Sequence, residues 1–125
     1  MTGAVLDAGA LVQFERSDRR VVAIVARALD HGDPLVVPAG VIAQLWRDGR
    51  RQVRLARLLG SPLCEVEPLD DRCARATGQL CGTSGTADVV DSSVVIVARR
   101  RAVRVLTSDA ADLRRLDPRL DVVPV

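Results

Sequence analysis

Short apolar runs rich in β-branched residues alternate along this chain with longer stretches in which apolar residues recur every three or four positions. The short runs have the length of buried strands, and the longer stretches have the period of amphipathic helices. Strands are expected at 4–6, 35–37, 64–66, 103–106 and 122–123. Strands that alternate with helices predict an α/β fold with a parallel sheet.

The helical period is clearest between Ser17 and Asp30, where Val21, Ile24 and Val25 begin one apolar face and a His-Gly-Asp-Pro sequence follows as a stop signal. Further helices are expected at 39–47, 49–59, 70–80 and 88–100, with a loop at 82–85 and one more helix after residue 109. The chain shows no repeat, low-complexity tract or linker, so its 125 residues are expected to form a single domain, 1–125.

Charge and hydrophobicity along the chain indicate neither a membrane protein nor a secreted one. The net charge is +2, and no stretch approaches the roughly 18 consecutive apolar residues of a membrane span. The N-terminal apolar run has no basic segment before it and is interrupted by Asp7, unlike a signal peptide. We therefore expect a cytoplasmic protein with no membrane association.

Several kinds of site are excluded by residue counts. The three cysteines are odd in number and have no Cys-x-x-Cys spacing, which argues against a disulfide framework or a zinc site. His31 is the only histidine, which excludes a two-histidine nuclease. A phosphate-binding Gly-rich loop is absent, and the lack of lysine argues against a receiver domain. With Phe14 and Trp46 as the only aromatic residues, any nucleic acid would be held by its phosphates rather than by base stacking.

Four aspartates are placed to meet at one edge of the predicted sheet. Asp7 ends the first strand and Asp109 follows the fourth, and ligand sites of open parallel sheets lie beyond the carboxyl ends of strands. Asp88 and Asp91 are spaced i, i+3 and share one face in the first turn of a helix. Like charges gathered in a partly dry cleft need a cation, and oxygen ligands favour Mg²⁺, with Mn²⁺ as a substitute.

The same residues also have an ordinary structural interpretation. Asp88 and Asp91 fit an N-cap followed by an acidic N3 residue, and Ser108 or Asp109 fits a cap of the last helix. Asp7 is harder to explain in this way, because it follows a buried strand and has no basic neighbour in sequence. As a set, the four residues favour a metal site.

The segments that carry these acids resemble a known family, the PIN-domain VapC toxins. The similar segments are VLDAGAL at 5–11, VVP at 36–38 leading into VIAQLWR at 41–47, DVVDSSV at 88–94, and VLTSD at 105–109. Their order and spacing match nearly end to end. The resemblance implies a three-layer α/β/α fold, a homodimer, a cognate VapB-type antitoxin, and Mg²⁺-dependent cleavage of structured RNA such as tRNA or rRNA.

By position, the resemblance makes Asp7, Asp91 and Asp109 catalytic, metal-binding acids and makes Asp88 an extra acid one turn before Asp91. Gln44 stands where most of the family has a glutamate. Glutamine offers a carbonyl oxygen to a metal or its water, but it removes a negative charge and cannot act as a base.

Two hydroxyls lie beside the acids. We expect Thr107 to contact metal-bound water or phosphate, and Ser92 to satisfy a helix end.

Five arginines recur at intervals of three to four residues and would form a stripe for RNA phosphates if one helix ran through them. They are Arg47, Arg50, Arg51, Arg54 and Arg57. The alternative is a solvated face without a ligand. Arginines 99–101, near a helix C-terminus, are expected to interact with the helix dipole.

The leading hypothesis is thus a metal-dependent endoribonuclease that acts as a toxin. The alternative, motivated by Gln44, is a catalytically weak PIN-like module that binds RNA or an antitoxin without cutting.

Overall fold

The five predicted strands form one parallel sheet in the order β3-β2-β1-β4-β5 in the computed structural model, which describes residues 3–125. The strands are β1 (Ala4–Leu6), β2 (Leu35–Pro38), β3 (Cys64–Glu67), β4 (Arg104–Thr107) and β5 (Val122–Pro124). The order reverses between β1 and β4, which pair through Ala4–Arg104, Val5–Val105 and Leu6–Leu106. The predicted parallel α/β sheet is confirmed.

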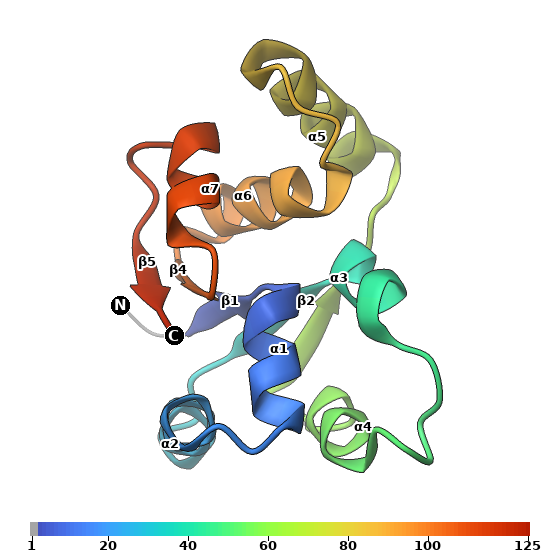
Figure 1. Ribbon diagram of the computed structural model, residues 1–125, viewed down its shortest axis with the longest axis vertical. Helices are drawn as coiled ribbons and strands as arrows, with labels where there is room; N and C mark the ends of the chain where they lie inside the picture. The colour runs from blue at the N-terminus through green and yellow to red at the C-terminus, as the bar shows by residue number, and fades with distance from the viewer. Residues whose placement is uncertain (1–2) are drawn as a thin grey trace.

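Helices cover both faces of the sheet and produce three layers (Figure 1). The helices are α1 (Ala8–Glu15), α2 (Arg19–Asp30), α3 (Ala39–Leu45), α4 (Val53–Leu59), α5 (Asp71–Ser84), α6 (Val89–Arg101) and α7 (Ala110–Leu116). One face carries α1, α2 and α4, and the other carries α6 and α7, with α5 packed on the outer side of α6. The fold is therefore an α/β/α sandwich.

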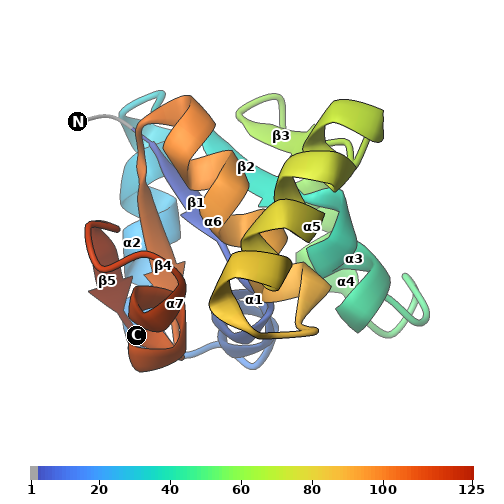
Figure 2. The same ribbon diagram turned by 90° about the horizontal axis from the view of Figure 1, so that it is seen from above.

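Helix α6 lies over the middle strands of the sheet and under α5 (Figure 2). Its residues from Ser92 to Ala98 are all buried, because the sheet covers one side of the helix and neighbouring helices cover the rest. Across residues 3–125, no single helix is long and apolar enough to cross a membrane; α5 and α6 pass such a test only as a pair bent by 114°.

Some predicted helix boundaries were wrong, and one helix was missed. The missed helix is α1, which follows β1 directly. Its start signal in the sequence is Asp7, the N-cap residue. Helix α4 begins at Val53, so the helix predicted from residue 49 was wrong over its first four residues. The predicted loop at 82–85 is the last turn of α5, which ends at Gly85 in the left-handed conformation with φ of 69°.

Candidate functional site

Asp7 connects β1 to α1 and is almost completely buried, with 3% of its surface exposed. Its Oδ1 accepts a hydrogen bond of 2.9 Å from the backbone N–H of Ala10 and so caps α1. Burial raises the pKa of Asp7, hydrogen bonds from Thr107 and Ala10 oppose this rise, and the charge of Asp109 adds to it. The sequence offered metal binding for this residue; the structure shows that it also caps a helix.

The first turn of α1 passes close to the segment after β4 at Gly9. A Cβ placed on Gly9 would overlap Oγ of Ser108 and lie 3.0 Å from the Ser108 Cβ. The β1–α1 turn and the β4–α7 loop are therefore in direct contact. This close approach places Asp7 and Asp109 at the same edge of the sheet.

Thr107 links these two acids. It is fully buried at the end of β4, and its Oγ1 accepts a hydrogen bond of 2.8 Å from the backbone N–H of Asp109. Its side chain also acts on Asp7, because it lowers the pKa of that carboxyl against the effect of burial. Asp109 occupies the N-cap position of α7 but makes no side-chain capping bond, so the predicted cap is not observed and its exposed carboxylate remains available for a ligand.

Asp88 and Asp91 lie at the start of α6, as predicted. Oδ1 of Asp88 accepts a hydrogen bond of 2.9 Å from the backbone N–H of Asp91, which confirms the capping interpretation of Asp88. Asp91 is half-buried, and its pKa is raised to about 6, first by burial and then by the charges of Asp88, Asp7 and Asp109. The four predicted acids therefore lie close enough together for the charges of three of them to raise the pKa of the fourth, Asp91.

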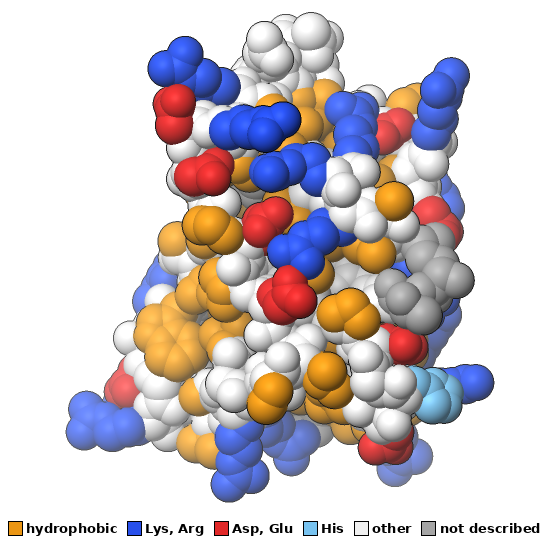
Figure 3. Space-filling view, turned by 180° about the vertical axis from the view of Figure 1, so that it is seen from behind, with side chains coloured by type: hydrophobic (Ala, Val, Ile, Leu, Met, Phe, Trp, Pro, Cys, Tyr) orange, Lys and Arg blue, Asp and Glu red, His pale blue; other side chains and the backbone are white. Residues whose placement is uncertain are grey.

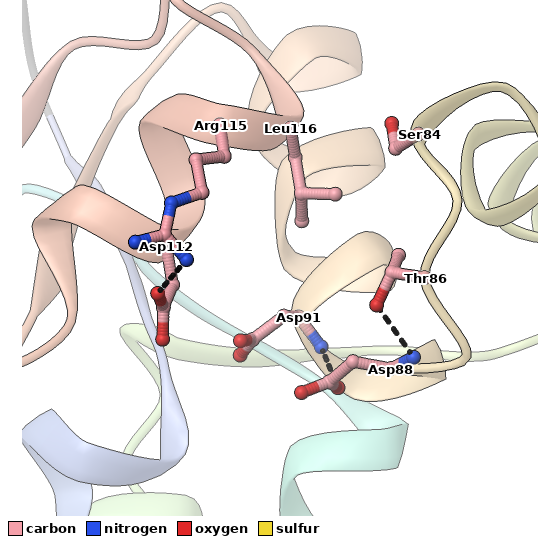
Figure 4. Close-up of a pocket in the computed structure, with 7 residues that line it drawn as sticks. All are labelled: Ser84, Thr86, Asp88, Asp91, Asp112, Arg115 and Leu116. Carbon is pink, nitrogen blue, oxygen red and sulfur yellow. Dashed lines mark hydrogen bonds and ion pairs between the residues drawn. The ribbon is translucent and has the colours of Figure 1, made fainter.

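Two of these acids line an open cleft between the α5–α6 connection and α7, with a volume of about 360 Å³ (Figure 4). The lining residues are Ser84, Thr86, Asp88, Asp91, Asp112, Arg115 and Leu116. The carboxylate of Asp91 points into this cleft, toward the side of α7 that carries Asp112. Asp112 and Arg115, which sequence reasoning did not single out, form an ion pair of 3.2 Å.

The donor set agrees with a hard cation in charge and atom type, because all four side chains offer carboxylate oxygens and none of the ion pairs among residues 3–125 involves them. In the same part of the chain, however, no three His, Cys, Asp or Glu side chains form a group that could hold a metal ion. Mg²⁺ is commonly bound by one or two carboxylates and retains several waters. A pair of these acids is thus a sufficient protein contribution.

Gln44 and Ser92 have different surroundings. Gln44 is an exposed residue of α3, a helix that packs on α6. The two helices approach each other closely one turn before Gln44, where a Cβ on Gly40 would lie 3.8 Å from Cγ2 of Val90. Ser92 is completely buried, and its Oγ accepts a hydrogen bond of 3.2 Å from Sγ of Cys81. Ser92 therefore joins α6 to Cys81 of α5 and does not satisfy a helix end, the role expected for it.

The predicted arginine stripe does not form, because no single helix contains its members. Arg47, Arg50 and Arg51 lie in the connection between α3 and α4, whereas Arg54 and Arg57 belong to α4. The guanidinium of Arg47 donates to the Trp46 carbonyl at 2.7 Å. The expectation of a continuous phosphate-binding helix face was wrong, although all five side chains remain exposed.

Arginines near the end of α6 pair with carboxylates rather than only with the helix dipole. Arg101 lies 2.6 Å from Glu65 and 3.2 Å from Glu67, and Arg99 lies 2.8 Å from Asp117. On the face opposite to the view of Figure 1, arginine and acidic side chains are interspersed (Figure 3). This face is therefore not a uniformly basic surface.

Solved structures with the same fold include chains from three complexes. The chain is similar to one in VapBC2 from Rickettsia felis bound to a DNA fragment from their promoter (TM-score 0.72, 15% identity, 98% of both chains covered). It is also similar to chains in FitAB bound to an IR36 DNA fragment (TM-score 0.68, 20% identity, 97% of this chain and 94% of that one) and in FitAcB from Neisseria gonorrhoeae (0.62, 21%, 95% of both).

No family model and no curated protein matches the sequence. At these identities the structural similarity concerns the fold, and it confirms the predicted three-layer PIN-like α/β/α architecture with a central parallel sheet. The similarity to a VapBC2 chain agrees with the resemblance seen in the sequence.

Proposed function

We propose that this protein is a Mg²⁺-dependent endoribonuclease of the VapC type that cleaves structured RNA, with tRNA or rRNA as the expected substrate class. The observation that carries the proposal is the meeting of acids at the ends of β1 and β4 and at the start of α6, where burial first and the charges of Asp88, Asp7 and Asp109 second raise the pKa of Asp91 to about 6. Such a cluster is costly without a cation and therefore favours one.

In this proposal two of the three acids Asp7, Asp91 and Asp109 would bind the Mg²⁺ or Mn²⁺ ion directly, and the third and Asp88 would act on it through their charge and the waters that such an ion retains. The ion, when bound, supplies Lewis-acid stabilisation of a phosphodiester and lowers the pKa of a water.

The protein's own residues then have distinct tasks. Thr107 orients the Asp7 carboxylate and the Asp109 backbone together. Asp88 caps the helix that presents Asp91, and burial of Asp7 excludes bulk water from one side of the site. Charge on a phosphate would be stabilised best in such a partly dry setting.

We further propose that the protein is a homodimer and that a VapB-type antitoxin inhibits it in the cytoplasm. Support comes from the sequence resemblance and from the complexes that contain chains of this fold. Large apolar side chains that are exposed in the isolated chain provide surface for such partners; they are Val12, Trp46, Val53, Val66, Leu69 and Val89. Light scattering of the purified protein tests the dimer.

Cleavage of total RNA tests the enzymatic proposal. Wild-type protein is incubated with Mg²⁺, with Mn²⁺ and with EDTA, beside Asp7→Asn, Asp91→Asn and a control, Asp121→Asn, whose side chain is exposed. Discrete fragments that disappear with EDTA and in both site variants, but not in the control, are expected. Intact RNA from a folded wild-type protein with either ion would overturn the proposal.

A second candidate is a binding module that holds RNA or an antitoxin without cleavage. Two observations favour it: Gln44 replaces an acid, and no three-ligand group is present among residues 3–125. RNA binding by wild-type protein without turnover in either ion would support this candidate.

A further inference from the structure

Arg115 is the one cationic residue among the described residues that line the cleft beside Asp88 and Asp91. It extends from α7, on the opposite side of the cleft from the start of α6 (Figure 4). Asp88 and Asp91 line one side of this space of about 360 Å³, which is open to solvent, and Asp112 and Arg115 of α7 line the other. Arg115 is thus the lining group that can attract an anion, and a phosphate diester bound to it would lie beside the acids proposed to hold the cation.

The guanidinium is held, but only weakly. One of its terminal nitrogens donates to Oδ1 of Asp112 at 3.2 Å, and the side chains of the pair are 79% and 54% exposed. Exposed ion pairs on one helix contribute little, and an arginine has five N–H donors. The remaining donors are therefore free to bind a ligand.

Arg115 is also not committed to the acids of the proposed metal site. Its ion pair is with Asp112, and no ion pair among residues 3–125 joins it to Asp88 or Asp91. The arginine thus remains separated from the carboxylates across the cleft, and the gap between them is available to a third group.

We propose that Arg115 binds a phosphate of the RNA substrate in this cleft, with Asp112 holding its side chain toward the acids. This inference rests on the proposed function and adds a substrate-binding residue that the acidic cluster alone does not supply. Guanidinium groups bind phosphate oxygens in bidentate fashion, which a single ammonium or hydroxyl cannot do.

Arg115→Ala, Arg115→Lys and Arg114→Ala test the inference. Arg114 precedes Arg115 on the same helix, is exposed, has the same charge and does not line the cleft, so it is the matched control. Binding of unfractionated tRNA is measured by filter retention over a range of salt concentrations without divalent ions. Cleavage of tRNA and rRNA in Mg²⁺ is measured separately, with KM and kcat resolved.

For Arg115→Ala we expect KM to rise by about tenfold with a smaller change in kcat, as for loss of a contact made equally in the ground and transition states. The salt dependence of tRNA binding should decrease by about one phosphate contact. Arg115→Lys should restore the salt dependence of tRNA binding, but its KM should lie between those of Arg115→Ala and wild type. Arg114→Ala should match wild type in both quantities.

Unchanged KM and salt dependence in Arg115→Ala, from a wild-type protein that cleaves RNA, would overturn the role of Arg115 and leave the proposed function intact. Equal losses in Arg114→Ala and Arg115→Ala would also overturn it, because they would indicate general charge rather than the cleft. A wild-type protein that neither binds nor cleaves RNA would overturn both proposals.

Discussion

The carboxylate of Asp88 accepts a hydrogen bond from the backbone N–H of Asp91 at 2.9 Å, so one acid of the site fixes the start of the helix that presents another. The same carboxylate also raises the pKa of Asp91 through its negative charge. Asp88 is therefore both a helix cap and part of an acidic cluster. These two roles can be separated by substitution.

Asp88→Asn should keep the cap and lose the charge, whereas Asp88→Ala should lose both. Asparagine is as good an N-cap as aspartate, and replacement of such a cap by alanine costs about 1 kcal/mol. Thermal unfolding should therefore show destabilisation for Asp88→Ala alone. Mg²⁺ affinity, measured by calorimetry, should fall in both variants if Asp88 compensates for the missing acid at residue 44. Unchanged Mg²⁺ affinity and cleavage in Asp88→Ala would contradict that compensation.

The pKa of Asp91 predicts a pH dependence of stability in metal-free protein. Its folded-state pKa of about 6 lies above the ordinary value of 3.8, so the folded state releases this proton less readily than the unfolded state. The contribution of Asp91 to the free energy of unfolding is therefore fully present below about pH 4 and is lost as the pH rises through 6. The loss should be at most on the order of 3 kcal/mol, since each pKa unit corresponds to about 1.4 kcal/mol.

Comparison with Asp91→Asn isolates this contribution, since the uncharged amide does not titrate. The variant should be more stable than wild type at pH 7 and should lose this advantage at pH 4 in chemical denaturation experiments. Mg²⁺ should stabilise wild type more than the variant, because a bound ion favours the charged carboxylate. An advantage that does not change with pH would show that Asp91 is not electrostatically strained.

Glu15 of α1 should stabilise α4, a helix without a capping side chain of its own. Oε2 of Glu15 accepts a hydrogen bond of 2.8 Å from the backbone N–H of Leu55, in the first turn of α4. Glu15→Ala should reduce the free energy of unfolding by about 1 kcal/mol, as expected for loss of a helix cap. Glu15→Gln retains an acceptor and should lose less; equal losses in urea titrations would argue against the hydrogen bond.

Gly9→Ala should disturb the site through backbone contact rather than through charge. A Cβ at this position overlaps Oγ of Ser108, which must rotate away, and lies 3.0 Å from the Ser108 Cβ, so the two segments must also shift slightly, at a cost of about 1 kcal/mol. RNA cleavage should fall as well, because the same contact places Asp7 beside Asp109. The double variant Gly9→Ala with Ser108→Gly removes the overlapping atoms and should regain most of the stability. Failure of this rescue in thermal unfolding would contradict the steric explanation.

Gln44→Glu should strengthen metal binding if residue 44 contributes to the site, because it adds a carboxylate on the helix that packs beside α6. We expect a several-fold gain in Mg²⁺ affinity and in RNA cleavage, measured side by side with Gln79→Glu, an exposed control on α5. No gain over this control would mean that residue 44 lies outside the site. A gain would explain how the wild-type residue limits activity.

Much of the fold was predictable because its signals are local. The short runs rich in β-branched residues are strands in the structure. The period of three to four residues correctly predicted that Val21 and Val25 are buried on one face of α2. The positions of Asp7 and Asp109 at one edge of the sheet were also predictable, since a parallel sheet gathers the carboxyl ends of its strands at one edge. Helix boundaries were less predictable: the start of α4 and the extension of α5 through Ser84 depend on tertiary contacts and on the φ of Gly85.

By itself, the sequence determined the alternation of strands and helices and the positions of Asp7, Asp88, Asp91 and Asp109 relative to them. Only the tertiary structure decided that Thr107 links Asp7 to Asp109, that Glu15 caps α4, and that Arg115 faces the acids across a cleft. The physical reason is that hydrophobic periodicity and helix caps act over a few residues. Which polar side chains meet depends on the sheet order and on the packing of buried residues that are distant in sequence.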